Sequence, residues 1–470
     1  MQAADFTPLL RPFFEGRKWI LAGGVVAGYT AVAKRLRELG AQRSLIVAES
    51  VGTGPLPDKD DAEWIDYDVR ANSMMDGFRQ GAALLADPPE IGRLAIDRYD
   101  PDGTALVLGN AFIHVPAVYG RRVYGWRRPE WWVLEDKVGI DEFWDAAGVP
   151  RAPSEVVAVQ AGTIRAAAKR LGRGDGVVLQ ADTTEGFNGG AEYLRWLKPP
   201  FGGELFDDAV SFLAEHCENV RVAPFLEGIP VSMHGCVLPE AVIVFRPVEN
   251  VILRPPGETK LQYAATATFY DPPAADREFM REQARKAGEL LRKRVDYRGF
   301  YTCDGILTAE GWRAIELNTR AGAGVSNIKK SIPELPLDLL QQVIVDGDWE
   351  RMKLPEKAAA ELERVIVEGM DAVRGGGGHA VVTVRAEETV EHDVVEDGVG
   401  GYRLAREGET PDGKLVLGPS HTGGLLRFFP DPERTPTGPS IAPRTIAAFA
   451  LADDVFGTGI GLLEPAKPVR

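Results

Sequence analysis

The segment GFYTCDGILTAEGWRAIELNTR, residues 299–320, is the most informative stretch of this chain. Two strands are predicted, one on each side of Ala309-Glu310-Gly311, so that the segment forms a β-hairpin. A three-residue hairpin loop favours glycine at its left-handed position, and Gly311 supplies that residue. With this loop, Thr308 is expected to pair with Trp312 across the hairpin.

Counting back along the predicted hairpin brings three oxygen-bearing side chains together. Asp304 falls opposite Glu316 and Asn318 falls opposite Thr302, so a period of two places the two acids and the amide on one sheet face. Directly opposite Cβ atoms lie about 4.5–5.5 Å apart. Two carboxylates at that distance repel each other unless a cation or a proton lies between them. Two acids and one amide suit Mg²⁺, so the sequence predicts a metal site. The alternative is a salt-bridged surface hairpin, but the apolar residues of both strands favour a cleft.

Arg320 extends the same pattern by one step. It follows Asn318 by two residues and therefore lies on the same face, about 6–7 Å further along the strand. Its guanidinium can bind a carboxylate through two parallel hydrogen bonds, which a lysine cannot do. We predict that Arg320 binds a substrate carboxylate, and the alternative is an arginine that caps the strand in solvent.

The segment before residue 50 predicts a different architecture. Trp19–Ala22 and Ser44–Ala48 are predicted strands, and helical spacing over residues 29–39 connects them. This β-turn-α-β order indicates a Rossmann-like lobe. The glycines of residues 23–28 lack the G-x-G-x-x-G register, so a glycine-packed turn is favoured over a dinucleotide site.

The middle of the chain alternates helices, strands and glycine-rich loops. Ile140–Ala147 has amphipathic spacing and ends at Gly148, a natural left-handed cap. Val177–Ala181 is a predicted strand that enters a polar glycine loop over residues 185–191. Four consecutive glycines at residues 375–378 predict a linker before a small C-terminal domain.

Taken together, these segments resemble the ATP-grasp ligases. Asp304, eleven residues, and then Glu316-x-Asn318-x-Arg320 is similar to the metal hairpin of that family. Lys137, which precedes the amphipathic helix, resembles the first phosphate-binding lysine. The glycine loop resembles the flexible loop over the phosphates, which implies ATP contacts at Gly186, Gly189 and Gly190.

The resemblance continues through the strands between this loop and the hairpin. Phe225-Leu-Glu-Gly228 resembles the hinge that holds adenine, which implies ATP contacts at Pro224, Phe225 and Leu226. Arg246-Pro-Val-Glu249 has the spacing of the basic and acidic pair on the next strand, so Arg246 is implied to be catalytic and Glu249 to bind ATP. Gln180 stands where the family has its second phosphate-binding lysine, and it is the expected contact there.

A narrower resemblance comes from EGIPVSMH, residues 227–234, which looks most like the pheganomycin-type peptide ligases. It implies an α/β and α+β multidomain fold. The expected parts are a Rossmann-like pre-ATP-grasp lobe (1–128), an ATP-grasp core (129–350, with a lid lobe at about 150–222 and a metal lobe at about 229–350) and a small C-terminal α+β domain (351–470). His234 and Arg254 are expected to help bind substrate.

The implied activity is ATP-dependent joining of a carboxylate to an amine through an acylphosphate, with Mg²⁺ as cofactor and ADP and phosphate as products. The expected substrates are small molecules, an amino acid or peptide, in peptide natural-product (antibiotic) biosynthesis. An ATP-binding regulatory protein and a small-molecule kinase on the same fold remain alternatives. The oligomeric state stays open between a monomer and a homodimer.

Composition limits the other classes of function. Lys and Arg number 54 and Asp and Glu number 69, which gives a net charge of −15 and argues against nucleic-acid binding. Three widely spaced cysteines form no CxxC pair, so reduced thiols in the cytoplasm are expected. The apolar run over residues 19–33 holds about 15 residues, short of the roughly 20 that a membrane-spanning helix needs, so no membrane partner is expected.

Overall fold

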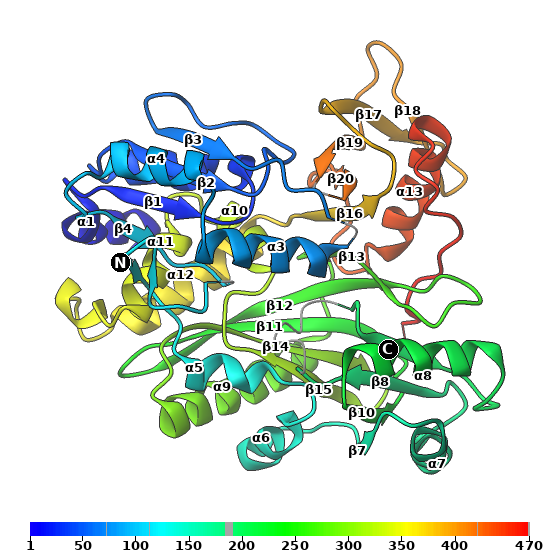
Figure 1. Cartoon of the computed structure of the whole chain (residues 1–470). Coiled ribbons are helices and arrows are strands. Elements are labelled where there is room, and N and C mark those ends of the chain that lie inside the picture. Colours follow the sequence, from blue (N-terminus) through cyan, green and yellow to red (C-terminus); the bar gives the residue numbers. More distant parts are fainter. Residues whose placement is uncertain (72, 112, 184–190, 421, 469–470) are drawn as a thin grey trace.

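The structure is a computed structural model that describes residues 1–71, 73–111, 113–183, 191–420 and 422–468 (Figure 1). Its N-terminal part is built on a six-stranded sheet of order β3-β2-β1-β4-β6-β5, in which β5 runs antiparallel to β6 and the other neighbours run parallel. The predicted strands β1 and β2 are confirmed and are fully buried, as strands covered on both faces are. The elements are α1 (Ala3–Phe14), β1 (Trp19–Ala22), η1 (Val26–Tyr29), α2 (Thr30–Glu38), β2 (Ser44–Ala48), β3 (Ala62–Asp66), α3 (Met74–Ala86), α4 (Glu90–Tyr99), β4 (Leu106–Leu108), β5 (Ala117–Val118) and β6 (Arg121–Tyr124).

A second, four-stranded sheet of order β7-β10-β8-β9 forms a separate layer, which we call the lid sheet. Helix α6 leads into it and ends at Gly148 with φ 63°, which confirms the predicted left-handed cap. The elements are α5 (Pro129–Trp132), η2 (Val133–Glu135), α6 (Ile140–Ala147), β7 (Glu155–Ala158), α7 (Ala161–Leu171), β8 (Val177–Ala181), β9 (Leu194–Leu197), α8 (Glu204–His216) and β10 (Asn219–Pro224).

The largest layer is a ten-stranded sheet of order β15-β14-β11-β12-β13-β16-β20-β19-β17-β18. Helix α9 packs on one face through Met280, Ala284, Ala287 and Leu291, the residues whose spacing predicts a buried stripe. The opposite face packs against α11 and α12. The elements up to α12 are β11 (Ile229–Val237), β12 (Val242–Leu253), β13 (Gln262–Ala267), α9 (Ala274–Val295), β14 (Gly299–Thr308), β15 (Gly311–Asn318), α10 (Val325–Ser331), α11 (Leu337–Val345), η3 (Trp349–Met352) and α12 (Ala358–Ala372).

The C-terminal strands continue this sheet. Figure 1 shows the orange strands running on from the green ones, since β16 pairs with β13 on one side and with β20 on the other. The remaining elements are β16 (Gly376–Val382), β17 (Val390–Glu396), β18 (Tyr402–Leu404), β19 (Gly413–Ser420), β20 (Gly423–Pro430) and α13 (Ala442–Phe456).

The linker prediction for residues 375–378 is therefore wrong, because Gly376, Gly377 and Gly378 belong to strand β16. Glycine is needed at these positions because neighbouring strands and helix α13 pack closely against the backbone. A Cβ on Gly377 would lie 2.2 Å from the carbonyl oxygen of Phe428, and one on Gly378 would lie 2.7 Å from the side chain of Thr445 in α13.

The hairpin of β14 and β15 differs from its prediction at the loop and agrees with it further back. Thr308 pairs with Gly311, so the expected pairing of Thr308 with Trp312 is wrong and the loop is one residue shorter. A β-bulge then leaves Ile315 without an opposite residue on β14. The extra residue restores the predicted register, with Asp304 opposite Glu316 and Thr302 opposite Asn318.

Among the helices that the structure describes, none combines the length and the apolar character needed to cross a membrane.

Candidate active site

A cavity of about 330 Å³ lies between the lid sheet and one face of the ten-stranded sheet. Strands β8 and β10 contribute one wall, and β11, β12, β14 and β15 contribute the other. Its ionisable and polar lining residues are Gln180, Arg221, Ser232, His234, Asn250, Arg254, Tyr263, Thr302, Asp304, Glu316, Asn318 and Arg320.

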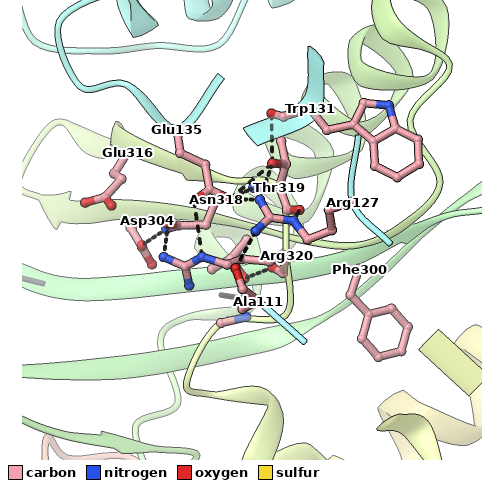
Figure 2. Close-up of polar contacts among 12 residues, drawn as sticks. Ala111, Arg127, Trp131, Glu135, Phe300, Asp304, Glu316, Asn318, Thr319 and Arg320 are labelled. Carbon is pink, nitrogen blue, oxygen red and sulfur yellow. Dashed lines mark hydrogen bonds and ion pairs between the residues drawn. The ribbon is translucent and has the colours of Figure 1, made fainter. Parts of the chain in front are cut away.

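The predicted metal residues meet in this cavity. Asn318 donates from Nδ2 to Oδ2 of Asp304 at 2.9 Å, and Figure 2 shows the Glu316 carboxylate beside them. The hydroxyl of Ser232 also donates to Asp304, and Asn250 donates from Nδ2 to Asp304 Oδ1 at 3.2 Å. The structure thus brings Asp304, Glu316 and Asn318 together and adds two neutral donors that the sequence analysis does not include.

The electrostatics of this group fit a divalent cation. Burial and the negative charge of Glu316 raise the pKa of Asp304 to about 6. They outweigh the hydrogen bonds from Ser232 and Asn250 and the charge of Arg320, which lower that pKa. The donor set is two carboxylates and one amide, an oxygen-only set of the kind that Mg²⁺ prefers. In the part of the chain that the structure describes, no three His, Cys, Asp or Glu side chains form a metal-binding group. Asp304, Glu316 and Asn318 would therefore hold Mg²⁺ together with ligands from outside the protein.

Lys137 is a buried cation that contacts this group through Glu316. It is 4% exposed and donates from Nζ to Oε1 of Glu316 at 3.0 Å. A buried ammonium needs a counter-charge, and here it shares the acid of the candidate metal site. The lysine predicted to bind phosphate thus lies within one hydrogen bond of the predicted metal residues.

Arg320 lies on the cavity face and is held from two sides. Its Nη2 donates to Oδ1 of Asn318 at 2.8 Å and its Nε donates to Oε2 of Glu135 at 3.2 Å (Figure 2). Burial opposes the charge of this guanidinium, but the carboxylates of Glu135 and Glu316 outweigh burial and raise the pKa of Arg320. An arginine that caps the strand in solvent is therefore not what the structure contains. Among the described residues Nη1 has no acceptor, which leaves it available to a ligand in the cavity.

Glu135 organises this end of the cavity and is missing from the sequence predictions. Its Oε1 accepts from the backbone N–H of Thr319 at 3.1 Å and from Nη2 of Arg127, while Arg127 also donates to the Thr319 carbonyl at 2.9 Å. Burial would raise the pKa of Glu135, but Arg320 and Arg127 outweigh burial and hold it low. Its position two residues before Lys137 is the only signal in the sequence that points to it.

The opposite end of the cavity is formed by the hinge after β10. Pro224, Phe225 and Leu226 all line the cavity, in agreement with their predicted place. Trp196 of the lid sheet stacks on the Phe225 ring with centroids 4.3 Å apart. Arg254, predicted to help bind substrate, lies at this end, 4.9 Å from the Phe225 ring centre, and forms a bidentate ion pair with Glu227 at 2.7 and 2.9 Å.

No family model matches the sequence, and a search of curated proteins finds no match. Solved structures do match. Biotin carboxylase from Campylobacter jejuni, in complex with ATP, superposes with a TM-score of 0.54 at 14% identity and covers 97% of this chain and 94% of its own. The biotin carboxylase domain of Hydrogenobacter thermophilus 2-oxoglutarate carboxylase, in complex with MgADP, ADP and bicarbonate, gives 0.50 at 14%, covering 96% and 91%.

Pyruvate carboxylase from Rhizobium etli superposes with a TM-score of 0.53 at 15% identity, and the match covers 89% of this chain. This chain corresponds to only 36% of the length of that enzyme. The structural neighbours are ATP-grasp enzymes. This chain has the ATP-grasp fold. At such low identity the likeness establishes the fold alone.

Within the ATP-grasp fold, Gln180 lines the cavity from β8 as expected, but it does not act alone. Its Oε1 accepts from Nη1 of Arg221, the residue opposite it on β10, at 2.7 Å. Arg221 is 1% exposed and binds Asp141 of α6 through Nε and Nη2 at 3.0 and 2.8 Å. A cation that the sequence analysis misses thus faces the cavity beside the glutamine. The predicted loop residues Gly186, Gly189 and Gly190 lie outside the described residues.

The structure does not bring Arg246 and Glu249 into the cavity, and neither residue lines it. Arg246 binds Asp271 at 2.7 Å and also pairs with Asp371 at the end of α12. The Glu249 carboxylate accepts from the Ser440 hydroxyl and from the backbone N–H of Ile441 at 3.1 Å, at the start of α13.

A bulge in β12 explains the misplacement of Glu249. Two residues of β12, Phe245 and Arg246, lie opposite the single residue His234 of β11. The bulge reverses the alternation that follows, so Asn250 faces the cavity and Glu249 faces α13. The position in the cavity expected for Arg246 and Glu249 is therefore wrong.

His234, predicted to help bind substrate, lines the cavity and is locked in one tautomer. The Thr302 hydroxyl donates to the Arg320 carbonyl at 3.3 Å, so Nδ1 of His234 must donate to that hydroxyl at 2.9 Å. Burial lowers the pKa of His234 to about 3, which keeps the ring neutral. A Cβ on Gly324 would lie 2.3 Å from Nε2, so the ring packs against the segment that follows Arg320.

Proposed function

We propose that this protein is an ATP-dependent carboxylate–amine ligase that forms an amide bond through an acylphosphate and releases ADP and phosphate. The observation that carries the proposal is the convergence of Asp304, Glu316, Asn318 and Arg320 in one cavity beside the lid sheet, with Lys137 hydrogen-bonded to Glu316. ATP-grasp enzymes with this fold include structures in complex with ATP and with MgADP.

The proposed reaction has two steps. A substrate carboxylate oxygen attacks the γ-phosphorus of ATP, and ADP leaves with the electrons of the broken P–O bond. The nitrogen of an amine then attacks the acyl carbon, phosphate leaves, and the nitrogen gives up a proton. Water would hydrolyse the acylphosphate if it reached this intermediate before the amine. The reaction therefore needs a cavity that excludes water, and the lid sheet covers the cavity on one side.

Each cavity residue has a role in this scheme. Asp304, Glu316 and Asn318 would hold Mg²⁺, which offsets phosphate charge when bound. Lys137 exchanges its contact with Glu316 for a phosphate oxygen. Arg320 binds the attacking carboxylate through Nη1 while Glu135 and Asn318 keep its guanidinium in place. The hinge at Phe225 receives the adenine ring.

The substrate class follows from the narrower sequence resemblance. Residues 227–234 are similar to those of pheganomycin-type peptide ligases, so we propose an amino acid or peptide as substrate and a role in peptide natural-product biosynthesis.

Phosphate release from ATP and Mg²⁺ in the presence of an array of amino acids and peptides tests the proposal. We expect release that depends on both a carboxylate and an amine, and that is lost in Glu316→Gln. Arg313→Gln, on the same strand but outside the cavity lining, is the matched control and should retain activity. If phosphate release is independent of the amine for every carboxylate tested, the ligase function is contradicted.

A further inference from the structure

Three basic side chains lie beside the cavity on the same face of the ten-stranded sheet. His379 of β16 is directly opposite Arg427 of β20, and its ring centre lies 5.1 Å from that of Tyr263, which lines the cavity. Lys330 of α10 reaches over the Phe429 ring, with Nζ 5.6 Å from the ring centre. We call these three residues the basic cluster.

The alternation along β16 and β20 fixes the face on which the basic cluster lies. Ala380, Leu426 and Phe428 are buried in one core with α13, on the far side of the sheet. Because neighbouring residues of a strand point to opposite faces, His379 and Arg427 point away from α13, toward the cavity side. Helix α10 is on this side too, since Asn327 donates to Thr266 of β13 at 2.8 Å. Lys330 follows Arg320 by ten residues, so one segment carries both.

The basic cluster lacks a counter-charge. Among the described residues no Asp or Glu forms an ion pair or a hydrogen bond with Arg427 or Lys330, although most of the buried arginines of this chain, such as Arg221, are paired. Burial lowers the pKa of Arg427, and burial together with Arg427 lowers the pKa of Lys330. Arg427 is half-buried whereas Lys330 is exposed, so it is the unpaired charge of Arg427, with Lys330 nearby, that costs folding free energy unless an anion joins it.

We propose that Arg427 and Lys330 bind the carboxylate of the amine substrate, which is therefore an amino acid or peptide with a free carboxyl group. This inference rests on the proposed ligase function. The planar guanidinium of Arg427 can take both oxygens of a carboxylate, and Lys330 adds a point charge. The chain of this substrate would run past His379 and Tyr263, which places its amine in the cavity. A phosphate group would be attracted by the same two cations, so the experiment must separate the two anions.

Thermal unfolding in sodium chloride, acetate and phosphate at matched ionic strength tests the site without any activity. In chloride we expect Arg427→Gln to be at least as stable as the unchanged protein, because the substitution removes a half-buried, unpaired charge. Acetate should raise the Tm of the unchanged protein and leave that of Arg427→Gln unmoved. Arg403→Gln is the matched control, because Arg403 is paired with Glu409 at 2.6 and 2.8 Å, and it should keep the full acetate effect.

Two results of this experiment would overturn the proposal. One is an acetate effect that survives in Arg427→Gln, which would show that the cluster does not bind carboxylate. The other is stabilisation of the unchanged protein by phosphate but not by acetate, which would assign the cluster to a phosphate group.

Amine kinetics test the same site during turnover. The substitution Arg427→Gln should raise the KM for the amine substrate found in the phosphate-release screen about tenfold. That change corresponds to the loss of one charge-assisted hydrogen bond. The KM for the C-terminal amide of that substrate, and the KM for ATP, should not change. Equal losses for the acid and the amide would contradict the proposal. If no amine supports turnover, the ligase function fails, while the unfolding experiment still decides whether the basic cluster binds a carboxylate.

Discussion

Arg320 and Arg246 both have a place in a family pattern, yet the structure puts them in opposite situations. Arg320 lies on the cavity face, where Glu135 and Asn318 hold two of its nitrogens and Nη1 remains free for a ligand. Arg246 lies outside the cavity between Asp271 and Asp371, and burial and the nearby Arg374 lower its pKa to about 10. The two arginines thus differ in the sheet face they occupy and in the donors that, among the described residues, have no acceptor.

Strands β15 and β12 each carry a bulge, and the two bulges have opposite consequences for the residues that follow them. In β15 the extra residue Ile315 compensates for a hairpin loop that is one residue shorter than expected, so Glu316 and Asn318 keep their predicted partners. In β12 the bulge at Phe245 and Arg246 has no such compensation, so Glu249 turns away from the cavity. The predictions below test whether function follows this division.

The largest effect is expected on the cavity side, at Lys137. Removing its ammonium in Lys137→Ala should slow turnover and weaken ATP binding by about 2–4 kcal/mol, because one charge-assisted contact to phosphate is lost in a closed site. Steady-state kinetics and nucleotide titration measure both effects. Lys414→Ala, which breaks a surface ion pair with Glu391 at 2.7 Å, is the control and should change neither. Unchanged kinetics in Lys137→Ala would remove this lysine from the site.

The next effect separates the two arginines by their role in the reaction. Arg320→Lys should lower kcat about 100-fold and change ATP affinity little, because lysine keeps the charge but cannot make the contacts with Glu135 and Asn318 that aim Nη1 at the attacking carboxylate. Comparison of kcat with the Kd for ATP gives this result directly. Equal losses in both quantities would place Arg320 among the nucleotide contacts.

Arg246→Lys should show the reverse behaviour. The substitution weakens pairs with Asp271 and Asp371, so we expect a loss of about 2 kcal/mol in the free energy of unfolding, measured by denaturant titration. The kcat of the folded protein should stay unchanged. A loss of kcat with unaltered stability would restore Arg246 to the catalytic group and break the comparison.

The smallest effect on turnover is expected at Glu249, where the change is in the pH dependence of stability. Burial raises the pKa of Glu249 to about 7 in the folded protein, above its ordinary value near 4.5. The folded state therefore binds a proton that the unfolded state releases, and stability falls as pH rises between about 4.5 and 7. Glu249→Gln lacks this titrating proton, so its stability relative to the unchanged protein should rise by about 3 kcal/mol across that window. A difference that does not vary with pH would contradict a buried, titrating Glu249.

Much of the fold follows from local patterns in the sequence. The short, fully buried strands β1 and β2 and the left-handed cap at Gly148 each depend on a few neighbouring residues, so they are predictable from local sequence. The Gly376–Gly378 stretch is not, because glycine serves equally in a linker and at a close approach of strands. Deciding between the two requires knowledge of what packs against it.

The candidate site is also predictable only in part, namely where its residues lie on one local element. Asp304, Glu316, Asn318 and Arg320 lie on one hairpin, so their register brings them together even with a different loop. Glu135 and Arg221 reach the cavity from distant segments, through contacts with Arg320 and with Gln180 that no single stretch of sequence contains. The bulge in β12 likewise leaves no mark on composition or spacing.

The most direct test of the ligase function combines nucleotide analysis with mass spectrometry of the product formed from ATP, Mg²⁺ and an active pair of substrates. The proposed function predicts ADP and phosphate in equal amounts with a product heavier by the amine minus one water, which is a new amide. AMP with pyrophosphate, or a phosphorylated alcohol with no amide, would contradict it.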